Sequence, residues 1–151
     1  MVSLSPRDLI PRSQQEVRGR LAALEERRNR LRAYGDRMVA EFRERFPDAP
    51  AYLTRYADRT NNDFRWRRSA ARRWRGEGVR RRNTSIELTG EDGMLLLQWL
   101  PEETRRVWID YERRRIELNL ALALTNYERM RLRDYLDRVA VLRRLGRESA
   151  G

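Results

Sequence analysis

The chain of 151 residues contains no cysteine, no histidine and no lysine. Without cysteine it has no disulfide and no thiol nucleophile, and without cysteine and histidine it lacks the ligands of ordinary zinc sites. Histidine is the most frequent general base in enzymes, so its absence excludes catalysis by a histidine general base. We therefore predict a protein that is not an enzyme and needs no cofactor or metal. The lack of cysteine also fits the reducing cytoplasm, which is the location we predict.

Long apolar segments are missing too. Residues 1–12 contain no apolar core of the length found in signal peptides. The longest strongly apolar run, residues 118–124, is far shorter than the roughly 20 residues that a membrane-spanning helix needs. We therefore expect no membrane partner. Residues 1–12 should form a loose N-terminal arm that docks on the body through Leu4, Leu9 and Ile10.

Glycine is absent from residues 101–145, and the only proline there, Pro101, is the first residue. Proline is tolerated in the first turn of a helix, and the next residues, Glu102 and Glu103, suit the positive end of the helix dipole. Gly146 follows, at a place where a helix commonly ends. The pattern predicts a helix over 101–145, about 68 Å long. A helix of this length cannot bury its own apolar side chains, so it needs a partner helix.

A second long helix is predicted over residues 13–46. It begins at a capping box, in which the Ser13 hydroxyl accepts from the backbone of Glu16 and the Glu16 side chain reaches back. Its apolar residues recur at alternating spacings of four and three, the pattern of a coiled-coil seam. Gly35 interrupts the seam and is a candidate bend, and Pro47 ends the helix. The seam residues are Val17, Leu21, Leu24, Leu31, Met38 and Phe42.

A small β-hairpin is predicted over residues 63–89, between the long helices. Residues 63–68 and 83–88 each alternate between apolar and polar side chains, which is typical of strands. Two short helices are expected beside this hairpin. One covers residues 51–58, and the other, residues 94–100, is apolar and should be buried where the hairpin meets the long helices. The first short helix would present Tyr52, Leu53 and Tyr56.

These elements predict one mainly α domain over residues 1–151. Its architecture would be a long antiparallel helical hairpin or bundle with a small Arg-rich β-hairpin insertion.

Arginine supplies all 34 basic residues, which exceed the 23 acidic residues and leave a net charge of +11. Residues 65–82 hold nine of these arginines and one acid, Glu77, so +8 of the charge is concentrated there. Guanidinium groups bind phosphates, and tryptophans between them can stack on bases. Three interpretations remain open: a nucleic-acid contact, a docking site for an acidic protein, and a solvated loop with Trp66 in the core. The candidate nucleic-acid-binding residues are Arg65, Arg67, Arg68, Arg72, Arg73, Trp74, Arg75, Arg80, Arg81 and Arg82.

Apolar residues surround the C-terminal helix over residues 116–124. A helix that is apolar on all sides is buried on all sides, which one partner helix does not achieve. Either the short elements cover this stretch or a second copy does, which predicts a homodimer. Asn119 and Asn126 lie seven residues apart, and either sets the register of a coiled coil or bonds locally at a polar edge. The candidate self-association residues are Ile116, Asn119, Leu120, Leu122 and Leu124.

Four acidic residues of the C-terminal helix raise the question of a catalytic or metal-binding carboxylate pair. Arginines lie at salt-bridge spacing from them, so a solvated helix face with surface ion pairs is the simpler interpretation. We predict no active site and no metal site here. The four residues are Asp110, Glu112, Glu117 and Glu128.

Two short segments carry a family resemblance. They are Asp63-Phe64-Arg65-Trp66-Arg67 and Tyr111-Glu112-Arg113-Arg114-Arg115-Ile116-Glu117-Leu118-Asn119. They resemble a family of small proteins of unknown function encoded on integrative conjugative elements and plasmids, some labelled integrase regulator. The family's Met-Gln after Leu-Asn is replaced here by Leu120-Ala121, and the resemblance covers about residues 63–127. It implies a mobile-element setting and regulation of DNA, with no catalytic chemistry.

These patterns predict a nucleic-acid-binding accessory or regulatory protein, with DNA as the first candidate, that uses an Arg/Trp-rich hairpin on a helical scaffold. The alternative is a non-enzymatic adaptor that binds an acidic protein partner, such as a recombinase or an effector complex.

Overall fold

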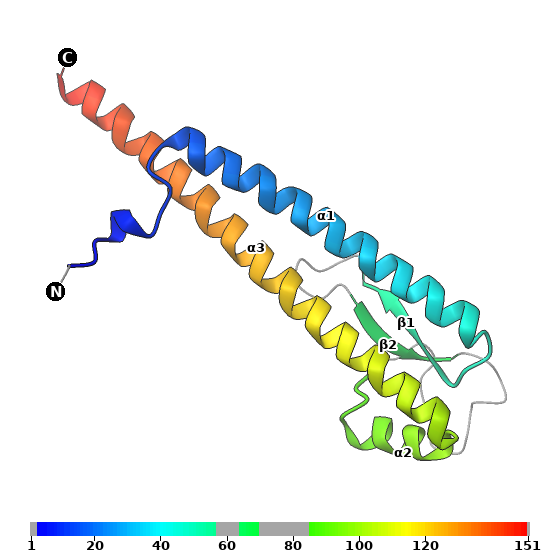
Figure 1. The fold of residues 1–151 in the computed structure, drawn as a ribbon. Coiled ribbons are helices and arrows are strands. Elements are labelled where there is room, and N and C mark those ends of the chain that lie inside the picture. Colours follow the sequence, from blue (N-terminus) through cyan, green and yellow to red (C-terminus); the bar gives the residue numbers. More distant parts are fainter. Residues whose placement is uncertain (1–2, 57–63, 70–84, 151) are drawn as a thin grey trace. The chain divides into compact units, whose positions relative to one another are not determined.

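The computed structural model describes residues 3–56, 64–69 and 85–150, and it confirms the mainly α fold (Figure 1). The long helices α1 and α3 have 32 and 49 residues and run in opposite directions. The chain forms two compact units, one of Met1–Asn29 with Leu124–Gly151 and one of Arg30–Ala123, and both long helices contribute to each unit. In chain order the elements are η1 (Pro6–Asp8, a 3₁₀ turn), α1 (Gln14–Arg45), β1 (Ala51–Arg55), β2 (Phe64–Arg68), β3 (Ser85–Ile86), α2 (Glu91–Trp99) and α3 (Glu102–Ala150).

The start of α1 follows its local sequence signal. The Oγ atom of Ser13 accepts a hydrogen bond from the backbone N–H of Glu16 at 3.1 Å. The Glu16 carboxylate accepts from the backbone N–H of Arg12 at 2.8 Å, so it reaches one residue beyond the amide of a standard capping box. The helix ends at Arg45, ahead of Pro47, as predicted.

The two ends of α3 differ in how well they were predicted. Pro101 precedes the helix, and its carbonyl accepts the first helical hydrogen bond, from Arg105, at 2.8 Å. Gly146 does not end the helix, which continues to Ala150. A glycine costs a helix about 1 kcal/mol relative to alanine, and no proline follows to forbid further helical hydrogen bonds.

The unit Arg30–Ala123 contains a three-stranded antiparallel sheet in the order β1-β2-β3. Trp66 of β2 lies opposite Leu53 on one side and Ile86 on the other, so the predicted pairing of β2 with β3 is confirmed. The short helix expected over residues 51–58 is wrong, because Ala51–Arg55 form β1. Its alternate residues are buried, and the edge of β2 satisfies its backbone groups.

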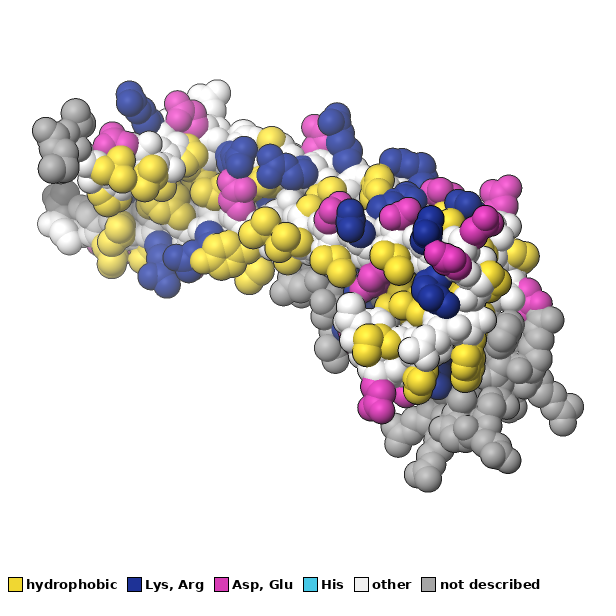
Figure 2. Space-filling view, turned by 60° about the horizontal axis from the view of Figure 1, so that its bottom comes forward, with side chains coloured by type: hydrophobic (Ala, Val, Ile, Leu, Met, Phe, Trp, Pro, Cys, Tyr) yellow, Lys and Arg dark blue, Asp and Glu magenta, His cyan; other side chains and the backbone are white. Residues whose placement is uncertain are grey.

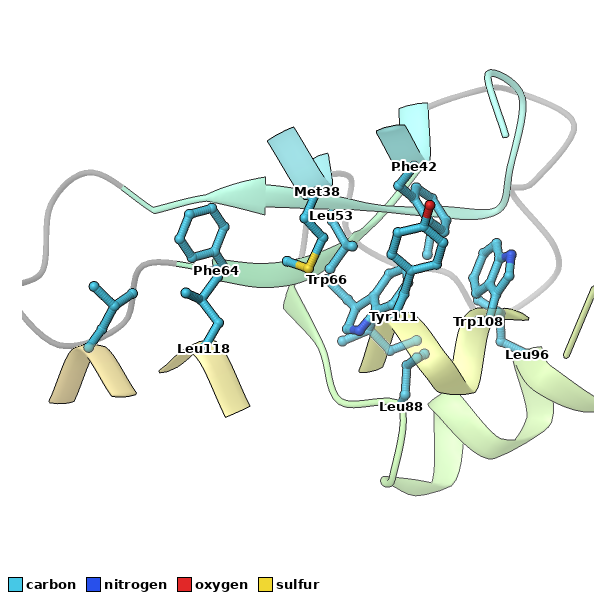
Figure 3. Close-up of a cluster of buried hydrophobic side chains, with 13 residues drawn as sticks. Met38, Phe42, Leu53, Phe64, Trp66, Leu88, Leu96, Trp108, Tyr111 and Leu118 are labelled. Atoms are coloured by element: carbon cyan, nitrogen blue, oxygen red, sulfur yellow. The ribbon is translucent and has the colours of Figure 1, made fainter. Parts of the chain in front are cut away.

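Aromatic side chains from the sheet and the helices form the core of this unit (Figure 3). The rings of Trp66 and Trp108 are stacked 5.2 Å apart, and Phe42 packs edge-on against both. Phe64 is fully buried against Gly35 of α1, where a Cβ atom would lie 2.0 Å from the Phe64 ring. Gly35 therefore has a packing role, since it leaves room for this ring.

The helix α2 begins three residues earlier than predicted and is only partly buried. Leu96 is in the core, whereas Met94, Leu95 and Trp99 are 53%, 48% and 73% exposed. The expectation that this segment is buried is therefore wrong for its outer face.

The N-terminal arm makes less contact than expected. Leu4 and Leu9 are exposed and only Ile10 is half-buried, so docking through all three residues is wrong.

Candidate nucleic-acid interface

The outer face of the sheet carries the described part of the arginine cluster. β2 is the central strand, and its alternate residues point into the core, which leaves Arg65 and Arg67 on the opposite face. The register sets Arg67 between Tyr52 of β1 and Ser85 of β3, and it sets Arg65 beside Thr54. The sheet thus presents a mixed basic, aromatic and hydroxyl surface.

Both outward arginines lie over the ring of Tyr56, the residue that follows β1. The Cζ atom of Arg65 is 4.6 Å from the ring centroid, and that of Arg67 is 5.5 Å away. These distances are in the range of cation–π attraction. One ring therefore contacts two guanidinium groups, and two like charges on one surface attract a phosphate more strongly than one does.

Arg68, the last residue of β2, has a different role. Its Nη2 atom donates to Oδ2 of Asp92 at 2.7 Å, and its side chain is 24% exposed. This ion pair joins the end of β2 to the first turn of α2. A nucleic acid would have to compete with Asp92 for Arg68.

The other predicted contact residues lie outside the described residues. They belong to residues 70–84, which lie between β2 and β3 in the sequence. These residues are Arg72, Arg73, Trp74, Arg75, Arg80, Arg81 and Arg82.

A polar cavity of about 250 Å³ lies beside Arg65, between the sheet and α3. Its walls offer both hydrogen-bond donors and acceptors, and they include a second arginine. The lining residues are Phe64, Arg65, Trp66, Ser85, Ile86, Glu87, Arg115 and Asn119.

A hydrogen-bond network anchors β2 to α3 on the inner side of the sheet. Trp66 Nε1 donates to Oε2 of Glu112 at 2.5 Å, and Arg115 donates to both carboxylate oxygens of Glu112 at 2.8 Å. The backbone carbonyl of Phe64 accepts from Arg115 at 3.3 Å and from Asn119 Nδ2 at 2.9 Å. The hydrogen bond to Glu112 raises the pKa of Arg115 despite burial, so the guanidinium stays charged.

This network corrects one sequence-based interpretation. Glu112 is only 8% exposed, so its assignment to a solvated face is wrong, whereas Asp110 and Glu117 are exposed as predicted. Trp66 and Glu112 are 46 residues apart in sequence. Sequence reasoning missed their contact because no local pattern pairs a strand residue with a distant helix residue.

The predicted self-association residues divide between the core and the surface. Leu122 is fully buried in the chain's own core, and Asn119 is held by the carbonyl of Phe64. Ile116, Leu120 and Leu124 are 48%, 58% and 61% exposed. Of the two alternatives, cover by the chain's own short elements is therefore wrong for these three side chains, and cover by a second copy stays a prediction.

A second polar cluster lies in the unit of Met1–Asn29 with Leu124–Gly151. Arg129 is 7% exposed and donates to Glu25 at 2.5 Å and to Oδ1 of Asn126 at 3.2 Å. Asn126 thus bonds locally, as one of the two interpretations had it, although it is buried instead of lying at a polar edge. Burial of Glu25 acts to raise its pKa, but the bond and charge of Arg129, helped by Arg28 and Arg133, lower it.

The chain was compared with protein families, curated proteins and solved structures. No protein-family model, no curated protein and no solved structure matches the chain. Among the described residues, no group of three or more acidic side chains is placed to hold a metal ion. In the same part of the chain, no helix has the length and apolar character needed to cross a membrane.

Proposed function

We propose that this protein binds nucleic acid, with DNA as the first candidate, and acts as a non-enzymatic accessory or regulatory protein. The contact surface is the outer face of the three-stranded sheet together with the arginine-rich segment 70–84 that joins two of its strands. The observation that carries the proposal is the pair of arginines, Arg65 and Arg67, held over Tyr56 on the central strand.

The chemistry of this surface suits phosphate groups. Guanidinium groups donate several hydrogen bonds and keep their charge, and aromatic rings beside them can stack on unpaired bases. The charge is also localised, because residues 65–82 hold nine of the 34 arginines and one acid. A general excess of arginine would not place +8 of the +11 charge in one segment.

The test is the salt dependence of DNA binding by Arg65→Ala/Arg67→Ala. Removal of one arginine–phosphate pair should reduce the slope of log affinity against log salt by about 0.9, so the double variant should reduce it by up to about 1.8. Fluorescence anisotropy with random duplex and single-stranded DNA at several salt concentrations measures the slope. The matched control, Arg143→Ala/Arg147→Ala, removes the same charge from exposed positions of α3 and should leave the slope unchanged.

A second variant tests the segment outside the described residues. Arg72→Ala/Arg73→Ala/Arg75→Ala should flatten the slope by up to about three units and weaken binding to all sequences alike. If neither set of substitutions changes affinity or slope, the sheet and its connection are not the nucleic-acid contact. An acidic protein partner would then be the better explanation of the arginine cluster.

A further inference from the structure

The outer face of the three-stranded sheet differs in charge from the surface of the helices. On the face of the molecule shown in Figure 2, basic side chains lie among acidic and hydrophobic ones. On the sheet, the positions opposite the two outward arginines hold neutral residues instead. Tyr52 and Ser85 flank Arg67, and Thr54 lies opposite Arg65. The sheet therefore presents positive charge beside aromatic and hydroxyl groups, with no acid in the facing positions.

Several groups on this face are flat. The guanidinium groups of Arg65 and Arg67 lie 4.6 and 5.5 Å from the ring centroid of Tyr56. Tyr52 adds a second ring beside Arg67. All four side chains are half-buried, so each keeps part of its surface in solvent. Bases stack on guanidinium planes as well as on aromatic rings, and the edge of a stacked guanidinium group still donates to phosphate.

We propose that this face binds a single strand of nucleic acid in preference to a duplex, by stacking unpaired bases on its rings and guanidinium groups. The inference rests on the proposed function, because the same arginines contact the phosphates. In a duplex, neighbouring base pairs cover the flat faces of each base, and only the base edges are open in the grooves. An unpaired strand presents both faces of its bases to such a surface.

The polar cavity beside Arg65 favours the same occupant. Its volume of about 250 Å³ is somewhat below the roughly 300–1,000 Å³ of pockets for drug-sized ligands, so it suits one heterocycle. Its walls offer donors and acceptors, among them the side chains of Ser85, Glu87 and Arg115. The pairing edge of a base is occupied by its complement in a duplex, so only an unpaired base presents this edge to the cavity.

An abasic DNA strand separates stacking from charge, because it carries the same phosphates without bases. The wild-type chain should bind ordinary single-stranded DNA at least about tenfold more tightly than an abasic strand of the same length, since more than one base stacks. Tyr52→Leu/Tyr56→Leu should remove most of this difference and leave the salt slope unchanged, because no charge is lost. Tyr127→Leu, at an exposed position of α3, is the matched control and should change neither quantity. Fluorescence anisotropy measures both.

The outcomes separate this inference from the proposed function. Equal affinity of the wild-type chain for ordinary and abasic strands would overturn the inference and leave the proposed function standing, since charge alone would explain the binding. An equal loss of affinity for single strand and duplex in the tyrosine variant would also overturn it, because the rings would then only support the sheet. Failure to bind any DNA would contradict the proposed function, and this inference with it. Circular dichroism confirms that each variant is folded.

Discussion

Gly35 lies at a position of α1 where the core of the unit Arg30–Ala123 leaves no room for a side chain. Gly35→Ala improves helix propensity by about 1 kcal/mol, but its Cβ atom would lie 2.0 Å from the buried ring of Phe64. Overpacking of a core costs about 1–3 kcal/mol, and a ring enclosed on all sides has little room to move. We expect Gly35→Ala to lower the free energy of unfolding, measured by urea denaturation.

Gly19 is the matched control for this substitution. It lies in the same helix, and a Cβ atom there would meet nothing within 4 Å. Gly19→Ala should therefore stabilise the protein by about 0.5–1 kcal/mol in the same urea experiment. If both substitutions stabilise the protein, the ring of Phe64 does not pack against α1 as described.

Trp66 shows how one indole N–H supports a buried charge. Trp66→Phe keeps a ring beside Trp108 but removes the donor to Glu112, which is 8% exposed. Oε2 of Glu112 keeps Arg115 as a donor but loses the indole N–H. A hydrogen bond to a charged group contributes about 1.5–3 kcal/mol, and we expect a loss of this size in the free energy of unfolding. Trp99→Phe is the control, because Trp99 is 73% exposed and surface changes stay within about 0.5 kcal/mol. Similar effects for the two variants would contradict the role of this hydrogen bond.

At the scale of elements, the pairing of α1 with α3 in the unit of Met1–Asn29 with Leu124–Gly151 depends on pH. The pKa of Glu25 is lowered in the folded protein, so the unfolded chain binds more protons at acidic pH. The stabilisation from Glu25 is therefore complete above its ordinary pKa of about 4.5 and is lost as the pH falls through the lowered value.

We expect Glu25→Gln to lower the melting temperature at neutral pH and to have a diminishing effect as the solution is acidified. Thermal unfolding of both proteins over this pH range measures the difference. Glu117→Gln, which changes an exposed carboxylate of α3, controls for the loss of one negative charge. A difference between wild type and Glu25→Gln that stays constant down to strongly acidic pH would contradict the assignment.

β1 and α2 are the elements for which local pattern was least informative. Tyr52, Leu53 and Tyr56 have a spacing that fits a helix face, yet the segment forms a strand because the open edge of β2 is available to it. In α2, the apolar composition suggested full burial, but a helix of nine residues packed on one side leaves its other side in water. The sequence shows which side chains are apolar, and only packing decides which of them are covered.

For the whole molecule, we expect more than half of the residues to be helical in solution, because α1 and α3 have 32 and 49 of the 151 residues. Far-ultraviolet circular dichroism measures this fraction. The substitutions of Arg65 and Arg67 should leave it unchanged, since both residues lie in β2. A helical fraction under about one half would contradict the fold.

The sequence by itself determined the two long helices, the pairing of β2 with β3 and the concentration of positive charge in residues 65–82. Their signals are local: a capping serine, a proline beyond a helix end, apolar residues that recur along one face of a helix or strand, and the number of arginines in a short segment. Only the tertiary structure decided that β1 completes the sheet, that Glu112 is buried under Trp66, and that Leu122 is covered while Leu120 is exposed. Each of these depends on contacts between residues far apart in the chain, and such contacts have no periodic signature in the sequence.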